Sequence, residues 1–184
     1  MFTDVRSKKL ILVAHCVLNQ NSISDGTADY PASNKEVVNL LLQSQAGIVQ
    51  MPCPELHCLG LDRGNVHGSE QPVVVENTRI RTSMNQQRAI RLLKVLVRQI
   101  VYQIEEYRRH EFDVCGIVGI DRSPSCGVNT TSIHNREENG EGVFIEALRK
   151  ELKKRHIRIE MVGIKALDVK DAVQSIERLL HNDQ

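Results

Sequence analysis

Three of the five cysteines stand just beyond strongly apolar segments of the sequence. Thiolates are preferred ligands of zinc, copper(I) and iron–sulfur centres, so these positions raise the question of a metal site. One of them lies in SPSCG (123–127), where serine, proline and glycine favour a turn rather than a packed core. The three are Cys16 after residues 9–15, Cys53 after residues 47–51 and Cys126 after residues 112–120.

The composition is that of an ordinary soluble globular protein. The 184 residues suffice for a sizeable core, and we expect residues 1–184 to form a single α/β domain. A net charge of +1 and an aromatic content of 3% argue against a nucleic-acid surface. No apolar run is long enough to span a membrane, and no signal peptide is evident, so we expect a cytoplasmic protein. In that compartment five cysteines, an odd number, fit metal binding or catalysis better than disulfides.

The elements that would position the cysteines alternate along the chain. Short apolar runs predict strands, and segments with helical apolar spacing predict helices, two of them behind capping boxes. The polar segments 52–72 and 121–140 predict loops, with residues 136–142 as a solvated connection or mobile lid. The predicted strands are 9–15, 47–51, 112–120 and 157–164, and the predicted helices are 35–45 behind Ser33 and Glu36, a long helix from the Ser83 and Gln86 box to about Arg109, 142–156, and 168–181.

This alternation predicts a three-layer, Rossmann-like α/β sandwich. We expect a mostly parallel sheet of about four or five strands with helices on both faces. Ligands bind outside the carboxyl ends of such strands, where Cys16, Cys53 and Cys126 would converge. The alternative is three unrelated reduced cysteines. Cys115 lies inside a predicted strand and is expected to be a small buried hydrophobe, whereas Cys58 remains ambiguous.

Three converging thiolates would leave one coordination position of a metal centre open, as catalysis requires. The C-x-x-C pairs of structural zinc sites are missing. Three classes of protein fit: an iron–sulfur enzyme, a zinc hydrolase with an activated water, and a non-catalytic redox sensor or sulfur carrier. His15, His57 and His67 lie near the same loops as possible proton shuttles or metal ligands, although such histidines are more often surface residues.

Three ordered blocks resemble the family of thiouracil desulfurases, or TudS-type desulfidases. They are VAHCVLNQNSISDG (13–26), CPELHCLG (53–60) and SPSCG (123–127), and the similarity extends over roughly residues 10–152. The chain departs from the family in its first block, where Ser22 stands in place of a second cysteine and Ile23–Ser24 in place of Arg-Tyr. It is therefore identified as a divergent member with an altered substrate pocket.

The resemblance implies a [4Fe-4S] cluster held by three cysteines, with the fourth iron free to take the sulfur of a thiocarbonyl substrate. Water would then replace that sulfur, which would leave as hydrosulfide. Glu55, next to a ligand cysteine, is the expected base or proton relay, although it could simply brace its loop. We place Ser123 with it in the catalytic group. The expected cluster ligands are Cys16, Cys53 and Cys126, and the expected substrate-binding residues are Ser125, Asp25 and Ser22, of which Ser125 and Asp25 could equally be turn residues.

The expected partner is a small thiolated molecule, with no nucleic acid and no membrane involved. The sequence leaves the oligomeric state open, because the long amphipathic helix serves a core as readily as a homodimer interface.

Overall fold

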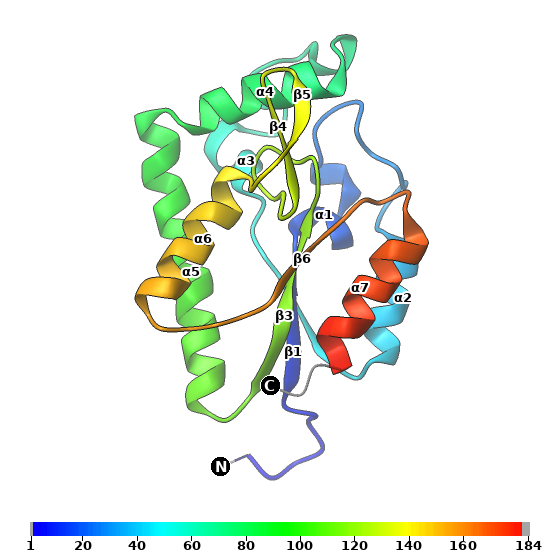
Figure 1. The fold of residues 1–184 in the computed structure, drawn as a ribbon, viewed down its shortest axis with the longest axis vertical. Coiled ribbons are helices and arrows are strands. Elements are labelled where there is room, and N and C mark those ends of the chain that lie inside the picture. Colours follow the sequence, from blue (N-terminus) through cyan, green and yellow to red (C-terminus); the bar gives the residue numbers. More distant parts are fainter. Residues whose placement is uncertain (1, 182–184) are drawn as a thin grey trace.

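The four apolar runs that predict strands form one parallel sheet in the order β2-β1-β3-β6 (Figure 1). The structure is a computed structural model, and it describes residues 2–181. A separate antiparallel hairpin pairs β4 with β5. The strands are β1 (Lys9–Val13), β2 (Gly47–Gln50), β3 (Asp113–Ile120), β4 (Thr130–Ile133), β5 (Arg136–Asn139) and β6 (Met161–Ile164).

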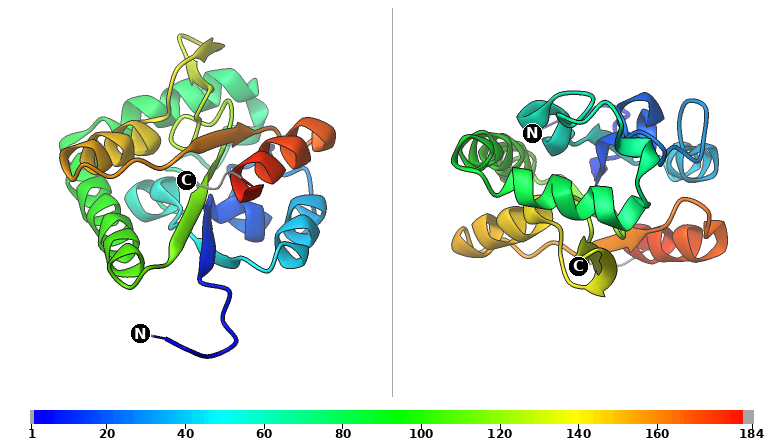
Figure 2. Two further views of the ribbon diagram at one scale, coloured as in Figure 1. Left: turned by 60° about the horizontal axis from the view of Figure 1, so that its bottom comes forward. Right: turned by 90° about the horizontal axis from the view of Figure 1, so that it is seen from above.

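Helices cover both faces of this sheet, with α5 and α6 on one side and α2 and α7 on the other (Figures 1 and 2). The predicted three-layer, Rossmann-like sandwich is therefore confirmed. The helices are α1 (His15–Leu18), α2 (Lys35–Gln43), α3 (Pro54–Leu59), α4 (Val73–Met84), α5 (Gln87–Arg109), α6 (Val143–Lys154) and α7 (Val169–His181), with 3-10 turns η1 (Gln20–Ser22) and η2 (Gly68–Glu70).

The sheet is buried most deeply at its two inner strands. All of β3 except its two ends is buried, as its nearly continuous apolar sequence predicts for an interior parallel strand. Gly116 in β3 allows α7 to pack closely, because a Cβ there would lie 2.7 Å from a Leu179 methyl group. Cys115, in the same strand, is buried as expected. Among residues 2–181, no helix combines the length and the apolar character that crossing a membrane requires.

Both predicted capping boxes are wrong, although α2 begins at Lys35 as predicted. The side chain that caps α2 is Asn34 rather than Ser33, and its Oδ1 accepts the Val37 N–H at 3.3 Å. Ser83 lies in the last turn of α4 instead of opening the long helix. The long helix begins at Gln87 without a side-chain cap. Tertiary packing of the amphipathic α5 therefore fixes its start, because no capping hydrogen bond does.

The sequence did not indicate α4, which begins at Val73 ahead of the predicted long helix, and both predicted loops also contain regular structure. Residues 52–72 include α3 and η2, and residues 121–140 include the β4–β5 hairpin. Residues 136–142 are therefore partly a paired strand and not a plain solvated connection. The fourth sheet strand is also shorter than predicted, since β6 starts only at Met161. In Figure 1, α3 and the β4–β5 hairpin lie above the carboxyl ends of β1 and β3. Of these additional elements, α3 contributes Glu55 to the lining of a cavity there, together with the loop residues 121–126.

Candidate functional site

A cavity of about 210 Å³ lies at the carboxyl edge of the sheet. It is lined by the segments that follow β1, β2, β3 and β6 and by part of α4. Cys16, Cys53 and Cys126 all line it, so the three loops converge as the parallel topology predicts. Its size is below the roughly 300–1,000 Å³ of pockets for drug-sized ligands, which suits a small molecule.

Cys16 is positioned by the backbone directly after β1. The Ala14 N–H donates to the Val118 carbonyl at 2.8 Å, which ties the end of β1 to β3. The buried Gln20 then donates from Nε2 to the Cys16 carbonyl oxygen at 2.9 Å. Burial raises the pKa of the Cys16 thiol to about 12, and the neighbouring Cys53 adds to that shift.

Cys53 occupies the N-cap position of α3. Its Sγ accepts the Leu56 N–H at 3.5 Å, and Pro54 at the first helical position needs no such partner. The Arg63 Nη2 lies 3.7 Å from the same sulfur. Burial raises the pKa of the Cys53 thiol. The Leu56 N–H and the Arg63 side chain act against this increase in the pKa of Cys53 without cancelling it.

Cys126 is held by a tightly packed loop. Ser123 Oγ accepts the N–H groups of Ser125 at 3.3 Å and Cys126 at 3.0 Å. Behind the loop, a Cβ on Gly119 would collide with the Cys126 carbonyl, and one on Gly142 would collide with the Ser125 carbonyl. Only glycine at positions 119 and 142 lets the loop lie this close to β3 and α6. Burial raises the pKa of the Cys126 thiol well above its usual range.

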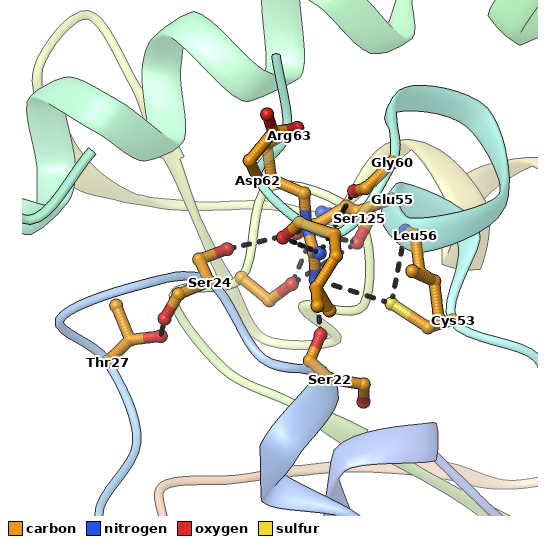
Figure 3. Close-up of polar contacts among 12 residues, drawn as sticks. Ser22, Ser24, Thr27, Cys53, Glu55, Leu56, Gly60, Asp62, Arg63 and Ser125 are labelled. Carbon is orange, nitrogen blue, oxygen red and sulfur yellow. Dashed lines mark hydrogen bonds and ion pairs between the residues drawn. The ribbon is translucent and has the colours of Figure 1, made fainter. Parts of the chain in front are cut away.

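Glu55 connects all three segments through its carboxylate (Figure 3). Its Oε1 accepts the Ser125 hydroxyl at 2.5 Å. Its Oε2 accepts the Ser24 hydroxyl at 3.2 Å and the Arg63 Nε–H at 3.1 Å. The residue is only 6% exposed, so it is a buried charge with a buried partner. The same Ser125 hydroxyl lies 3.6 Å from the Cys126 sulfur, which links the carboxylate to a cysteine through one hydroxyl.

Arg63 is the charged partner of Glu55, and the sequence did not single it out. All five of its N–H donors have partners. Nη2 donates to the Ser22 carbonyl at 2.5 Å and to the Cys53 sulfur. Nη1 donates to the carbonyls of Gly60 and Leu61 in the preceding turn. Its backbone has a φ of 54°, an uncommon left-handed conformation for a residue with a side chain. An isolated arginine between Asp62 and Gly64 carries no sequence signal for such a role.

The structure brings most of the predicted substrate-binding and catalytic residues to the cavity. Ser22, Ser123 and Ser125 line it together with Glu55. Ser22 donates its hydroxyl to the Asn19 carbonyl at 2.9 Å. Asp25 does not line this cavity; it is exposed and borders a small neighbouring recess. Ser125 rather than Ser123 makes the direct contact with Glu55, because the Ser123 hydroxyl accepts backbone N–H groups.

The histidines and the remaining cysteine take different places. His15 lines the cavity, and burial lowers its pKa. His57 is exposed, with Nδ1 2.7 Å from the Cys53 carbonyl oxygen, and the exposed His67 pairs with Glu70 at 2.8 Å. Cys58 lies outside the cavity lining, and its Sγ donates to the Ala89 carbonyl at 3.6 Å. Of these residues only His15 could meet a ligand in the cavity.

The three thiols are the type of donor that iron–sulfur clusters use. Within residues 2–181, no three His, Cys, Asp or Glu side chains are grouped closely enough to hold one ion. A multi-iron cluster does not require such a group, because each thiolate binds a different iron. Cys16, Cys53 and Cys126 interact electrostatically with one another across the cavity, and they bring the soft thiolate donors that such clusters use. These three cysteines would hold the cluster.

Fold and site together define an α/β enzyme-like domain with a three-cysteine cavity at the carboxyl edge of its sheet. The sequence model of the 2-thiouracil desulfurase family matches residues 11–159, and the chain belongs to this family. It is 27% identical over 178 residues to the uncharacterized protein MJ0003 of Methanocaldococcus jannaschii, covering 96% of this chain and 99% of that protein. No solved structure matches the chain significantly.

Proposed function

We propose that the protein hydrolyses the thiocarbonyl group of a small thiolated compound of the thiouracil type and releases hydrosulfide. The observation that carries the proposal is the convergence of three cysteines on a cavity whose wall also contains the Glu55–Ser125 pair. Membership of the desulfurase family supports the reaction class. When bound by Cys16, Cys53 and Cys126, a [4Fe-4S] cluster would supply a Lewis-acidic iron for the substrate sulfur.

The reaction needs a proton acceptor but no electron donor. A water oxygen adds to the thiocarbonyl carbon, the carbon–sulfur bond breaks, and the sulfur keeps the bonding electrons. It leaves as hydrosulfide with one proton of the water, and the second proton goes to the protein. Ser125 is placed to pass that proton on, because its hydroxyl already donates to Glu55 Oε1 at 2.5 Å.

The rest of the site holds this relay in place. Arg63 and Ser24 occupy Glu55 Oε2, so Oε1 is the oxygen directed at Ser125. Both residues of the pair are buried, with Glu55 6% and Ser125 1% exposed, and burial strengthens their electrostatic interaction. The chain's own contribution is therefore orientation of a hydroxyl and a carboxylate beside the cysteines.

The test is anaerobic reconstitution with iron and sulfide, followed by incubation with 2-thiouracil. We expect iron and acid-labile sulfide in the protein, and uracil and hydrosulfide released in equal amounts. Replacing any of Cys16, Cys53 or Cys126 by serine should reduce the bound iron, whereas Cys115→Ala, a thiol buried in β3, is the matched control and should retain it.

Three results would overturn parts of this proposal. Protein that takes up neither iron nor acid-labile sulfide would refute the cluster. A colourless, active protein with stoichiometric zinc would instead identify a zinc hydrolase. A loaded protein that releases no sulfide from any thiolated compound would favour a redox or sulfur-carrier role.

A further inference from the structure

Several buried polar side chains around the cavity are bound within the protein. Gln20 donates from Nε2 to the Cys16 carbonyl and accepts the Asp29 N–H at its Oε1 at 3.1 Å, so both ends of its amide are held. Arg63 uses all five of its N–H donors. Two asparagines that line the same cavity differ from them, because one end of each amide has no partner within the described chain.

Asn77, on α4, has a free acceptor. Its Nδ2 donates to the Arg122 carbonyl at 3.4 Å and to Ser132 Oγ at 3.3 Å. The Ser132 hydroxyl proton itself goes to the Arg122 carbonyl at 2.8 Å, so Ser132 can only accept from Asn77. These partners fix which end of the amide carries the nitrogen. Within the described chain, Asn77 Oδ1 receives no hydrogen bond, although the residue is only 6% exposed.

Asn34 has the complementary free donor. As the N-cap of α2 it accepts the Val37 N–H at Oδ1, which fixes its amide orientation as well. Its Nδ2 donates to no acceptor among residues 2–181, and the residue is 2% exposed. The cap explains the oxygen of this amide but leaves both N–H groups of its nitrogen without a partner.

The two free atoms belong to residues that line the cavity. No fully enclosed side-chain nitrogen or oxygen in the described part of the chain lacks a hydrogen-bond partner. Both free atoms therefore retain contact with water; both residues line the cavity, and Asn77 also borders the small recess next to it. A ligand that displaces this water without offering hydrogen bonds would leave an amide donor and an amide acceptor unsatisfied. The cavity thus selects for ligands with matching polar atoms.

We infer that Asn77 and Asn34 recognise the non-reacting atoms of the substrate, Asn77 Oδ1 by accepting a ring N–H and Asn34 Nδ2 by donating to a carbonyl oxygen or ring nitrogen. This assignment rests on the proposed function and specifies the substrate class: a neutral heterocyclic thioamide with a free N–H and a second acceptor. The charge of Glu55 is already balanced by Arg63. This buried ion pair therefore does not call for a charged ligand, and a neutral one fits. Methylation of the ring nitrogen should abolish recognition by Asn77.

The experiment measures calorimetric binding of uracil, 1-methyluracil and 3-methyluracil to the reconstituted protein. These probes carry no sulfur, so binding is separated from chemistry. Wild type should bind uracil about fivefold to tenfold more tightly than at least one methylated form, the worth of one hydrogen bond. Asn77→Ala should bind uracil and that form equally. Asn34→Ser keeps a good helix cap but loses the amide donor, and it should weaken uracil binding by a similar factor while retaining the discrimination.

Asn39→Ala is the control, because this asparagine is exposed on α2 and does not line the cavity. It should keep the preference for uracil. Three results would each overturn the inference. The first is that Asn77→Ala still discriminates between uracil and the methylated form. The second is that Asn34→Ser binds uracil as tightly as wild type, and the third is that wild type binds all three probes equally or binds none. If Asn77→Ala fails to fold, the inference is still tested by the preference of wild type for uracil and by the uracil affinity of Asn34→Ser. Sulfide release from 2-thiouracil is measured in parallel. Absence of sulfide release with the expected binding pattern would refute only the proposed reaction, and sulfide release without that pattern would refute only the roles of Asn77 and Asn34.

Discussion

Two of the cavity's cysteines are held in opposite ways. The Cys126 loop is fixed by its own backbone, through the Ser123 cap and the close approach of Gly119 and Gly142. The Cys53 segment is tied by one charged side chain, because Arg63 reaches back to both Cys53 and Glu55. The first region depends on close backbone packing, whereas the second depends on one buried charge. The Cys126 loop should therefore be destabilised by added bulk, and the Cys53 segment by loss of the buried charge.

The largest expected effect comes from removing that charge. Arg63→Met would leave Glu55 buried without its ion-pair partner, and we expect the free energy of unfolding to fall by about 3–5 kcal/mol. Urea denaturation of wild type and variant would measure the change. The segment that carries Cys53 should loosen as well, so iron uptake on reconstitution should fall.

The same substitution at Arg122 is the control. Arg122 also lines the cavity but is exposed, so Arg122→Met should change stability by less than about 0.5 kcal/mol. Adding Glu55→Gln to Arg63→Met removes the unpaired charge and should recover about 1–3 kcal/mol. Equal effects of the two arginine substitutions, or a double variant no more stable than Arg63→Met, would show that Arg63 does not hold its segment electrostatically.

The contrast also explains how far the sequence predicts this protein. The sheet, its parallel direction and the convergence of three cysteines follow from local apolar runs and from the rule that parallel strands end at one edge. The Cys126 loop is equally local, since SPSCG contains the cap and the turn residues that shape it. Features encoded within a few residues were predictable.

Features that depend on contacts between side chains outside one short motif could not be predicted from the sequence. Nothing near Arg63 indicates that it folds back onto Glu55, and the start of α4 has no side-chain cap to announce it. The free amide atoms of Asn34 and Asn77 become evident only when every other partner is known. The roles expected for Ser123 and Ser22 stay predictions, and Asp25 lies away from the cavity because its turn faces a different recess.

The backbone-held loop should respond to crowding rather than to charge. Gly142→Ala would push a Cβ into the Ser125 carbonyl, and we expect a loss of about 2–3 kcal/mol of stability by overpacking. Gly142 has a φ of −70°, so alanine fits its backbone and any loss must be steric. Gly47→Ala is the control, because its Cβ would meet the Lys9 carbonyl at 3.6 Å and the Leu10 Cβ at 3.9 Å, both ordinary contact distances. Urea midpoints of the two variants should differ clearly; similar midpoints would mean that the loop yields easily.

The smallest effect should separate the two serines of the Cys126 loop. Ser123→Ala removes an acceptor for the N–H groups of Ser125 and Cys126, and we expect it to cost about 1 kcal/mol of stability. Ser125→Ala removes the hydroxyl between Glu55 and Cys126, so sulfide release should fall more than in Ser123→Ala. Thermal unfolding and sulfide release measured on both reconstituted variants provide the comparison. If Ser123→Ala proved the more damaging to turnover at equal cluster content, the relay would run through Ser123, and the loop's cap would itself take part in catalysis.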